Sequence, residues 1–372
     1  MKVAIIHPWF LVLGGGEKVV EALAASFPNA DMFALLGRPD RIPDTLQGRR
    51  IHYSFLNHVP GIRKLHRELM FLYPMAIESL DLSSYDLVIS SAGPATFGVN
   101  VRQDALHICY CHSPGRSWWD QYAERQTSLS PIGKATFTAF STYIRMWEFS
   151  AAQRVDKFAA NSSYIAQRIR KYLRRDACVI YPPVNTGMGY LASRHQDYYL
   201  SVSRLEPRKR LDLVIDACNR LDRRLIIVGT GAEESRLKAI AGPKTEFAGR
   251  VSDSELPQLL AHCRAFLFAA DEDFGIVPVE AQAFGRPVIA YGHGGSLETV
   301  RVGDPRGSSD TGVFFSEQTV DSVVEAIQRF EDREEQFLPK QIQQHARRFD
   351  TSVFMERMNA FIEGAMNDRS RT

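Results

Sequence analysis

Two carboxylates, Glu272 and Glu280, enclose a Phe-Gly pair in the run EDFGIVPVE. An apolar stretch at 265–270 precedes this run, and a helix-like stretch follows it from 279 to 284. We therefore expect a buried strand to deliver Glu272 to a loop at its carboxyl end, with Glu280 in the first turn of the next helix. Ligands bind at such strand ends in open α/β sheets. Carboxylates there accept hydrogen bonds from the vicinal hydroxyls of a ribose or a pyranose. The alternative is an acidic loop residue and a carboxylate that the helix dipole favours.

Two cations, Arg204 and Lys209, follow the strand expected at 199–202. Fixed cations at a strand end suit a pyrophosphate whose leaving charge must be neutralised, whereas the alternative is a solvated basic loop. Gly229 follows the next expected strand, in a turn that can pass close to a ligand. Val251 follows the third, where backbone groups could face a base.

Three glycines, 14–16, and then Glu17 connect the first apolar stretch to an expected helix. Gly15 and Gly16 allow close backbone approach to a ligand, and a helix N-terminus offers N–H groups to an anion. The run matches neither the GxGxxG fingerprint nor a P-loop, so a plain strand-to-helix turn is the alternative.

His112 ends the strand expected at 106–111. A histidine there can donate to a substrate oxygen or a phosphate, although a lone histidine is more often structural. The loop that follows contains Arg116, Trp118 and Trp119. Aromatic side chains in such a loop suit sugar or lipid contact, and the alternative is that they anchor the loop.

Short apolar runs alternate with stretches of helical period, which predicts an α/β fold with parallel sheets and crossover helices. Each half of the chain resembles one Rossmann-like unit. We expect an N-terminal domain at 1–183, a hinge at 184–197 and a C-terminal domain at 198–350, with a helix at 351–366 that packs back on the first domain. The expected strands are 3–7, 31–35, 87–90, 106–111, 157–160, 178–180, 199–202, 224–228, 245–247, 265–268 and 287–290.

The composition excludes several classes of protein. With 372 residues the chain is long enough for two domains, and its net charge of +2 is too small to indicate nucleic-acid binding. Its five cysteines are scattered, so we expect reduced thiols in a cytoplasmic protein. No run reaches the ~18 apolar residues of a membrane-spanning helix. Asp271 and Asp273 form a D-x-D pattern, from which we infer no metal site.

Charge is distributed unevenly, because residues 1–184 carry +6 and the remainder carries −4. The stretch 163–175 has five basic residues and no acid, and 134–147 adds aromatic residues. Basic amphipathic helices with interfacial aromatics can lie on an anionic membrane surface, whereas the alternative is ordinary surface helices.

These segments together resemble the retaining, nucleotide-sugar-dependent glycosyltransferases of family 4. That family has the GT-B architecture, two Rossmann-like domains that face each other across a crevice. The matching segments are the triple glycine with Glu17, HSPxR from His112, Asn161-Ser162, YPPV from Tyr181, Ser203-Arg204 through Arg210, and 272–280. The segment 112–120 is most similar to bacterial mannosyltransferases of polysaccharide or O-antigen assembly.

The resemblance implies a role for each matching residue. Arg204 and Lys209 would clamp the donor diphosphate, Glu280 the ribose, and Glu272 the sugar hydroxyls. The resemblance also implies backbone contacts to the donor and side-chain contacts to the acceptor. The donor contacts are Gly15, Gly16, Gly229, Val251, Phe274, Gly275 and Ile276, the acceptor contacts are Glu17, Arg116, Trp118 and Trp119, and His112 would lie near the reacting sugar.

The implied reaction moves a hexose, mannose from GDP-mannose, onto a polyprenyl-diphosphate-linked glycan with retention of configuration. It needs no metal or other cofactor, and the enzyme would be peripheral at the inner face of the membrane. The alternatives are a UDP-sugar-dependent transferase with a different acceptor, a nucleotide-sugar epimerase, or a non-enzymatic nucleotide-sugar-binding module.

Overall fold

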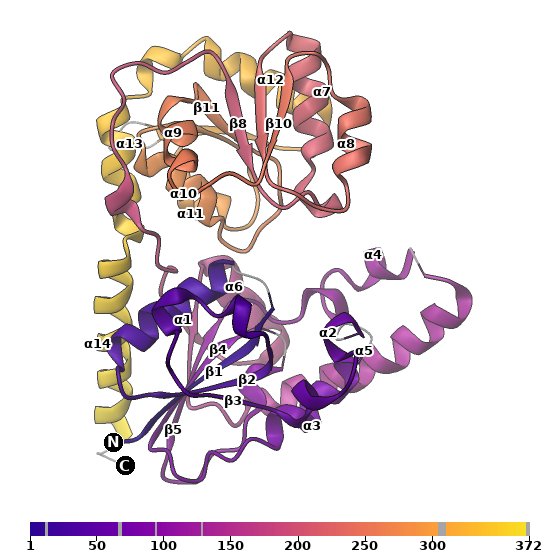
Figure 1. The fold of residues 1–372 in the computed structure, drawn as a ribbon, viewed down its shortest axis with the longest axis vertical. Coiled ribbons are helices and arrows are strands. Elements are labelled where there is room, and N and C mark those ends of the chain that lie inside the picture. The colour runs from indigo at the N-terminus through magenta and orange to yellow at the C-terminus, as the bar shows by residue number, and fades with distance from the viewer. Residues whose placement is uncertain (12–13, 66–68, 94, 128, 304–309, 370–372) are drawn as a thin grey trace. The chain divides into compact units, whose positions relative to one another are not determined.

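The computed structural model describes residues 1–11, 14–65, 69–93, 95–127, 129–303 and 310–369. The chain divides into two compact α/β units (Figure 1). Unit 1 comprises Met1–Pro183 and Phe354–Thr372, and unit 2 comprises Val184–Val353. The division falls at the Pro182-Pro183 pair, and residues 184–197, expected as a hinge, belong to unit 2.

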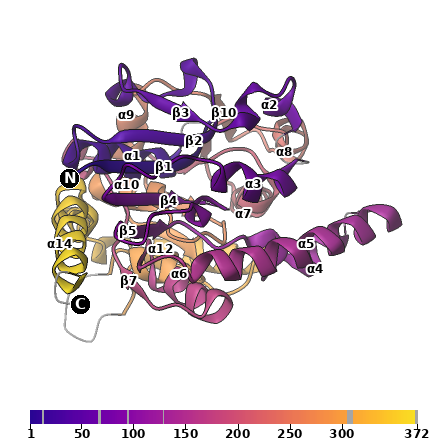
Figure 2. The ribbon, with the colours of Figure 1, turned by 90° about the horizontal axis from the view of Figure 1, so that it is seen from below.

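Unit 1 contains a parallel sheet in the order β3-β2-β1-β4-β5-β6-β7. Its strands are β1 (Val3–Phe10), β2 (Asp31–Gly37), β3 (Ile51–Tyr53), β4 (Leu87–Ala92), β5 (Leu106–Cys111), β6 (Lys157–Ala160) and β7 (Ala177–Val179). Its helices are α1 (Gly15–Ser26), α2 (Ile62–Leu65), α3 (Tyr73–Glu78), α4 (Tyr122–Thr127), α5 (Pro131–Ala152), α6 (Ser163–Arg168) and α14 (Thr351–Arg369). Helices α4 and α5 project together away from the sheet of this unit (Figure 2).

Helix α14 completes the core of unit 1. Phe354, Met358, Ile362 and Ala365 recur at helical spacing and are buried in the same cluster as β1 and β4. The ring of Phe354 meets that of Tyr110 on β5 edge to face, with centroids 5.5 Å apart. The expected helix is therefore present, although Phe361 only borders the core and Ile362 takes the buried position.

Unit 2 contains a parallel sheet in the order β10-β9-β8-β11-β12-β13. Its strands are β8 (Tyr199–Val202), β9 (Leu225–Val228), β10 (Thr245–Gly249), β11 (Ala265–Phe268), β12 (Val288–Tyr291) and β13 (Gly312–Phe315). Its helices are α7 (Leu211–Leu221), α8 (Glu234–Ile240), α9 (Glu255–His262), α10 (Ile276–Ala283), α11 (Ser296–Thr299), α12 (Val320–Glu331) and α13 (Pro339–Ala346).

Two edge strands, β3 and β13, were not expected from the sequence. Conversely, β1 is longer than expected, because it continues through His7-Pro8 to Phe10. Its pairing with β4 ends at Ile6, while its pairing with β2 continues to Phe10. The missing N–H of Pro8 therefore falls where one side of the strand is no longer paired.

The strand order reverses once in each sheet, between β1 and β4 in unit 1 and between β8 and β11 in unit 2. In open α/β sheets, ligands bind beside the carboxyl ends of the strands at this reversal. The loop that leaves β8 carries Arg204 and Lys209, the loop that leaves β11 carries Glu272, and Glu280 follows in α10.

Candidate active site

The loop after β8 carries Arg204 and Lys209, and glycines of the next loop support it. A Cβ on Gly229, whose φ is +133°, would lie 1.9 Å from the carbonyl oxygen of Ser203. A Cβ on Gly231 would lie 2.3 Å from the carbonyl oxygen of Leu205. Gly229 therefore closely approaches the backbone of the Arg204 loop, and its contact with a ligand stays a prediction.

The loop after β11 carries Glu272 and is held by a glycine pair that the sequence reasoning missed. The Gly295 N–H donates to the carbonyl oxygen of Glu272 at 2.9 Å. A Cβ on Gly295 would lie 2.2 Å from Phe274 Cα, and one on Gly294 2.5 Å from the Glu272 carbonyl oxygen. Two adjacent glycines shortly after the strand expected at 287–290 were the available signal, because they allow this close approach.

Lys209 and Glu272 form an ion pair that joins these two loops across the strand reversal. The Lys209 side chain is mostly buried. Burial, followed by the charges of Arg208 and Arg204, lowers its pKa to about 8. Arg204 is more exposed and pairs with Glu206 at 2.8 Å. The two cations predicted to clamp a diphosphate therefore lie in one loop, and one of them already contacts the carboxylate predicted to bind the sugar.

Helix α10 begins directly after this loop. Gly275 precedes it with φ +88°, a left-handed conformation that favours glycine, and Ile276 is its first residue. Glu280 is the fifth helical residue and is partly exposed, so the expectation that it lies in the first turn is wrong by about one residue. Phe274 is buried, with its ring 5.5 Å from that of Phe349. Its contribution to a ligand would therefore come from its backbone.

Val251, expected near a base, follows β10 in a partly buried loop position, where its side chain packs on the core of unit 2. The first aspartate of the D-x-D pattern, Asp271, contacts His293 Nδ1 at 3.0 Å. Within the described ranges of the chain, no group of three or more His, Cys, Asp or Glu side chains could hold a metal ion.

In unit 1, two histidines flank the N-terminus of α1. A Cβ on Gly16 would lie 3.4 Å from His7 Cε1 and 3.7 Å from His112 Nε2. His112 Nε2 also lies 2.8 Å from Ser91 Oγ. Burial and the nearby charge of His7 lower the pKa of His112 to about 3, so this imidazole is neutral at physiological pH. His7 was not expected at the site, because it lies inside an apolar strand.

Glu17 does not have the exposure that an acceptor contact needs. It is buried, and its Oε2 accepts the Gly14 N–H at 2.9 Å while its Oε1 lies 3.5 Å from His7 Nε2. This is a capping arrangement, in which a side chain satisfies a backbone donor at the helix start. Gly15 is the first residue of the same helix.

The loop after His112 is anchored by its tryptophans. Trp118 is 3% exposed and donates its indole N–H to Glu148 at 2.9 Å, so the expectation that it contacts an acceptor is wrong. Trp119 is partly exposed and stacks on Tyr172. Its indole N–H donates at 2.7 Å to Oε2 of Glu148, the oxygen that also accepts from Trp118. Arg116 begins a 3₁₀ turn and keeps a partly exposed side chain.

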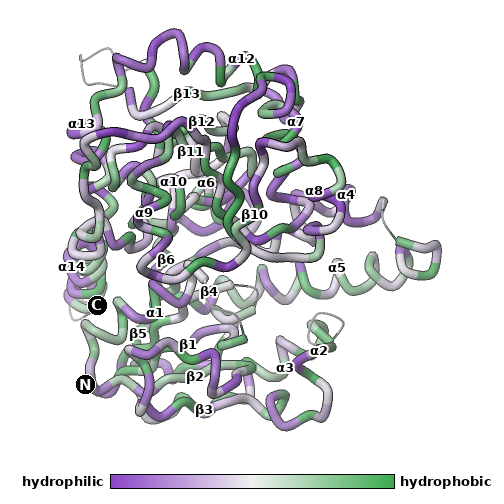
Figure 3. Tube along the Cα trace, turned by 45° about the horizontal axis from the view of Figure 1, so that its top comes forward, coloured by the Kyte–Doolittle hydropathy of each residue, from purple (hydrophilic) through white to green (hydrophobic). Residues whose placement is uncertain are grey.

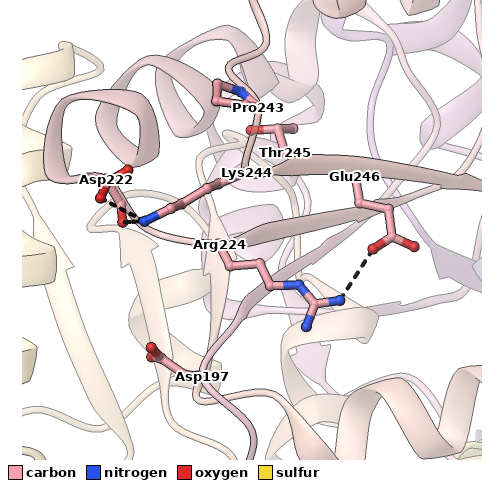
Figure 4. A pocket seen from close by; sticks show the side chains of 7 residues that line it. All are labelled: Asp197, Asp222, Arg224, Pro243, Lys244, Thr245 and Glu246. Atoms are coloured by element: carbon pink, nitrogen blue, oxygen red, sulfur yellow. Dashed lines mark hydrogen bonds and ion pairs between the residues drawn. The ribbon is translucent and has the colours of Figure 1, made fainter.

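A cavity of about 400 Å³ lies elsewhere in unit 2, at the amino ends of β8, β9 and β10 (Figure 4). Lys244 pairs there with Asp222, and Arg224 with Glu246. This cavity lies at the opposite ends of the strands from Lys209, and both of its cations are already paired with carboxylates. The loops after β8 and β11 therefore remain the candidate active site.

Comparison with known proteins identifies the family to which the chain belongs. The family model described as Glycosyltransferase Family 4 matches residues 13–187, and the one described as Glycosyl transferases group 1 matches residues 191–349. Together they span most of both units. The chain belongs to the family 4 glycosyltransferases and has the two-domain GT-B fold. It is a glycosyltransferase.

Several individual proteins are similar to this chain. The alpha-1,3/1,6-mannosyltransferase ALG2 of Kluyveromyces lactis is 27% identical over 80% of this chain and 71% of its own length. A GDP-mannose-dependent monoacylated alpha-(1-6)-phosphatidylinositol monomannoside mannosyltransferase of Corynebacterium glutamicum is 36% identical over 34% of this chain and 35% of its own. The structure of Anabaena Alr3699/HepE with UDP-glucose has a TM-score of 0.70 at 17% identity, covering 98% of this chain and all of that one, and supports the fold.

Proposed function

We propose that this glycosyltransferase moves mannose from GDP-mannose onto a lipid-linked glycan, with retention of the anomeric configuration. The observation that carries the proposal is the Lys209–Glu272 pair at the strand reversal, with Arg204 in the same loop. The choice of mannose is supported by similarity to proteins named mannosyltransferases, one of them named as GDP-mannose-dependent.

The donor would replace the internal ion pair with two new interactions. Lys209 and Arg204 would neutralise the diphosphate, and Glu272 would accept hydrogen bonds from the sugar hydroxyls. The bond between C1 and the diphosphate oxygen then breaks, and a bond to the acceptor oxygen forms on the same face. The acceptor proton passes to the departing diphosphate. Because two side-chain cations already match the leaving charge, we propose that no metal or other cofactor is required.

We also propose that unit 1 attaches to an anionic membrane surface, but through fewer basic residues than the sequence predicted. Arg168 is 5% exposed and bonds to Asp120 at 2.6 Å. Arg175 donates to the carbonyl oxygens of Ala152 and Val155. These two arginines therefore stabilise unit 1. Arg170, Lys171 and Arg174 are the exposed members of the run.

The projecting helix α5 supplies the apolar part of this surface. Ile132 and Met146 are 79% and 68% exposed, and Tyr143 and Phe149 are exposed as well. Figure 3 shows hydrophobic residues recurring along this helix. The one carboxylate of α5, Glu148, is buried, so no acid of this helix would repel anionic lipid. Among the described residues, every helix is too short or too polar to cross a bilayer.

A donor screen tests the enzymatic proposal. Thermal unfolding would be followed with GDP-mannose, UDP-glucose and ADP-glucose, because a ligand that binds the folded state raises its stability. Radiolabelled GDP-mannose and a polyprenyl-diphosphate-linked glycan would then be incubated with the enzyme, with and without a chelator. We expect stabilisation by GDP-mannose and labelled lipid in both reactions. Transfer from UDP-glucose and not from GDP-mannose would refute the proposed donor. An isomerised donor would refute transfer, and loss of activity in the chelator would refute metal independence.

Vesicle flotation tests the membrane proposal. We expect binding to anionic vesicles at low salt, weakened by added salt, since each cation near the surface contributes roughly 1 kcal/mol and screening acts within about 8–10 Å. Replacing Arg170, Lys171 and Arg174 with Gln should abolish binding. The matched control replaces Arg236, Lys238 and Arg329, exposed basic residues of unit 2, and should bind normally. Absence of binding at low salt would favour a soluble acceptor.

A further inference from the structure

Helix α5 buries a carboxylate that the proposed reaction does not use. Glu148 is 0% exposed, and burial raises its pKa, although hydrogen bonds from Trp118, Trp119 and the Gly115 N–H and the charge of Arg168 oppose that shift. Isolated buried carboxylates are costly, so their partners are informative. All three of these donors lie in the loop that follows His112.

The three hydrogen bonds to Glu148 divide between its two oxygens. Oε2 accepts the indole N–H groups of Trp118 and Trp119 at 2.9 and 2.7 Å, and Oε1 accepts the Gly115 N–H at 3.3 Å. A Cβ on Gly115 would lie 1.9 Å from the Trp118 ring, so only glycine allows this ring to lie against the backbone. Glu148 thus fixes both ends of the short turn that contains Arg116 and Ser117.

A second buried charge holds the rest of the same loop. Arg168 of α6 donates to Ser113 Oγ at 2.7 Å, to the Pro114 carbonyl oxygen at 3.3 Å and to Asp120 Oδ1 at 2.6 Å. Upstream, the carbonyl oxygen of His112 accepts from Asn161 Nδ2 at 2.9 Å. Contacts from surrounding elements therefore hold the loop on both sides of Arg116 and Ser117, whose side chains keep exposed surface.

We infer that Glu148 is a positioning residue for acceptor recognition, holding the Gly115–Trp119 turn so that Arg116 meets an anionic group of the acceptor. The inference rests on the proposed function, because it assumes that the loop after His112 binds the acceptor. A carboxylate suits this position better than an amide, since only a carboxylate can accept at both oxygens. Glu148→Gln retains the shape but places an NH₂ group against at least one N–H donor.

Steady-state kinetics of Glu148→Gln test the inference. We expect the KM for the lipid-linked acceptor to rise at least ~10-fold, the size of effect that loss of a charge-assisted hydrogen bond produces. The KM for the donor and the rate of donor hydrolysis should stay within about two-fold, because Arg204, Lys209, Glu272 and Glu280, the side chains proposed to hold the donor, lie in unit 2. Arg116→Gln should raise the same acceptor KM, and the double variant should be little worse than either single one. If the KM values for the acceptor and the donor rise equally, Glu148 has only a structural role, and this result would overturn the inference.

Indole NMR provides a readout that does not depend on turnover. The chain has four tryptophans, and the indole N–H signals of Trp118 and Trp119 can be assigned with Trp118→Phe and Trp119→Phe. In Glu148→Gln we expect these two signals to shift while Trp9 and Trp147 keep theirs. If all four signals shift, the variant has disturbed the whole unit, and Trp119→Phe then becomes the kinetic test. An unchanged acceptor KM in a folded Trp119→Phe variant would also overturn the inference. Failure of the proposed function would appear separately, as absence of transfer by the unaltered protein.

Discussion

The ammonium group of Lys209 and the carboxylate of Glu272 neutralise each other, and each is the predicted ligand of a different part of the donor. The proposed nucleotide-sugar donor would therefore separate them, with its diphosphate taking the cation and its sugar taking the anion. The pair thus favours a ligand that presents both groups at once. Free phosphate or free sugar would leave one partner of a mostly buried pair uncompensated.

Donor capture should weaken as the pH rises through about 8. Burial and neighbouring arginines lower the pKa of Lys209 to this value, so its positive charge is present below pH 8 and lost above it. The pH profile of kcat/KM for the donor reports groups that titrate in the free enzyme. We expect this profile to have an alkaline limb, a fall in kcat/KM near pH 8. A bound diphosphate stabilises the ammonium form of Lys209. The fall in kcat, measured at saturating donor, should therefore occur at a higher pH than the fall in kcat/KM. Lys209→Arg should move the limb to higher pH, and a limb that does not move would exclude Lys209 as its source.

Removal of either cation should slow transfer. We expect Arg204→Ala and Lys209→Ala to lower turnover at saturating donor by at least ~10²-fold, because each removes charge from the leaving diphosphate. Lys209→Ala should be the more severe, since it also leaves Glu272 without its partner. Arg220→Ala removes an exposed arginine paired with Asp321 and is the control. Wild-type turnover in both site variants would contradict the assignment.

Glu280→Ala should weaken donor binding and leave turnover of bound donor largely intact. A ribose contact is made in both the ground state and the transition state, so its loss raises KM with little change in kcat. We expect a rise of about ten-fold in the dissociation constant for GDP, measured by calorimetry. Glu335→Ala, at an exposed position of the same unit, should bind GDP normally. Normal GDP affinity in Glu280→Ala would show that the ribose is held elsewhere.

Gly229→Ala should damage the active site indirectly. Its φ of +133° disfavours any side chain, and the added Cβ would displace the Ser203 carbonyl at the start of the Arg204 loop. We expect lower stability by about 1–3 kcal/mol and a loss of turnover beyond the unfolded fraction. Gly364→Ala in α14, where no atom lies within 4 Å of the added Cβ, is the matched control and should be neutral or slightly stabilising. Full activity in Gly229→Ala would show that the loop tolerates displacement.

Acid should destabilise the protein well before its carboxylates protonate. Burial lowers the pKa of His107 and His112 to about 3 and that of His345 to about 4, against about 6.5 in the unfolded chain. The unfolded state therefore binds more protons below pH 6.5, and stability falls as the pH falls, by up to about 1.4 kcal/mol per pH unit for each histidine. Urea unfolding at pH 7 and pH 5 measures this. His107→Gln should reduce the change in the free energy of unfolding between pH 7 and pH 5, whereas replacing the exposed His58 with Gln should not. An equal change in the two variants would show that the buried histidines do not cause it.

The sequence predicted most of the central strands because they are short, apolar and bounded by turn residues. The edge strands β3 and β13 were not predicted, because they are defined by pairing with a neighbouring strand more than by their composition. The cations and carboxylates were identifiable by type and by their place after strands. The direct ion pair between Lys209 and Glu272, and the burial of Trp118, Glu17 and Arg168, could not be predicted, since they depend on which side chains the loops bring together.

The buried positions of α14 have a consequence for biosynthesis. Residues 184–353 form unit 2 without interruption, whereas unit 1 needs Phe354, Met358, Ile362 and Ala365 to fill its core. During translation, unit 2 can therefore reach its final fold before unit 1, although unit 1 begins to emerge from the ribosome first. Until α14 is synthesised, the apolar surface beside β1 and β5 is available to chaperones and proteases, and a fragment ending at Pro183 would expose it permanently.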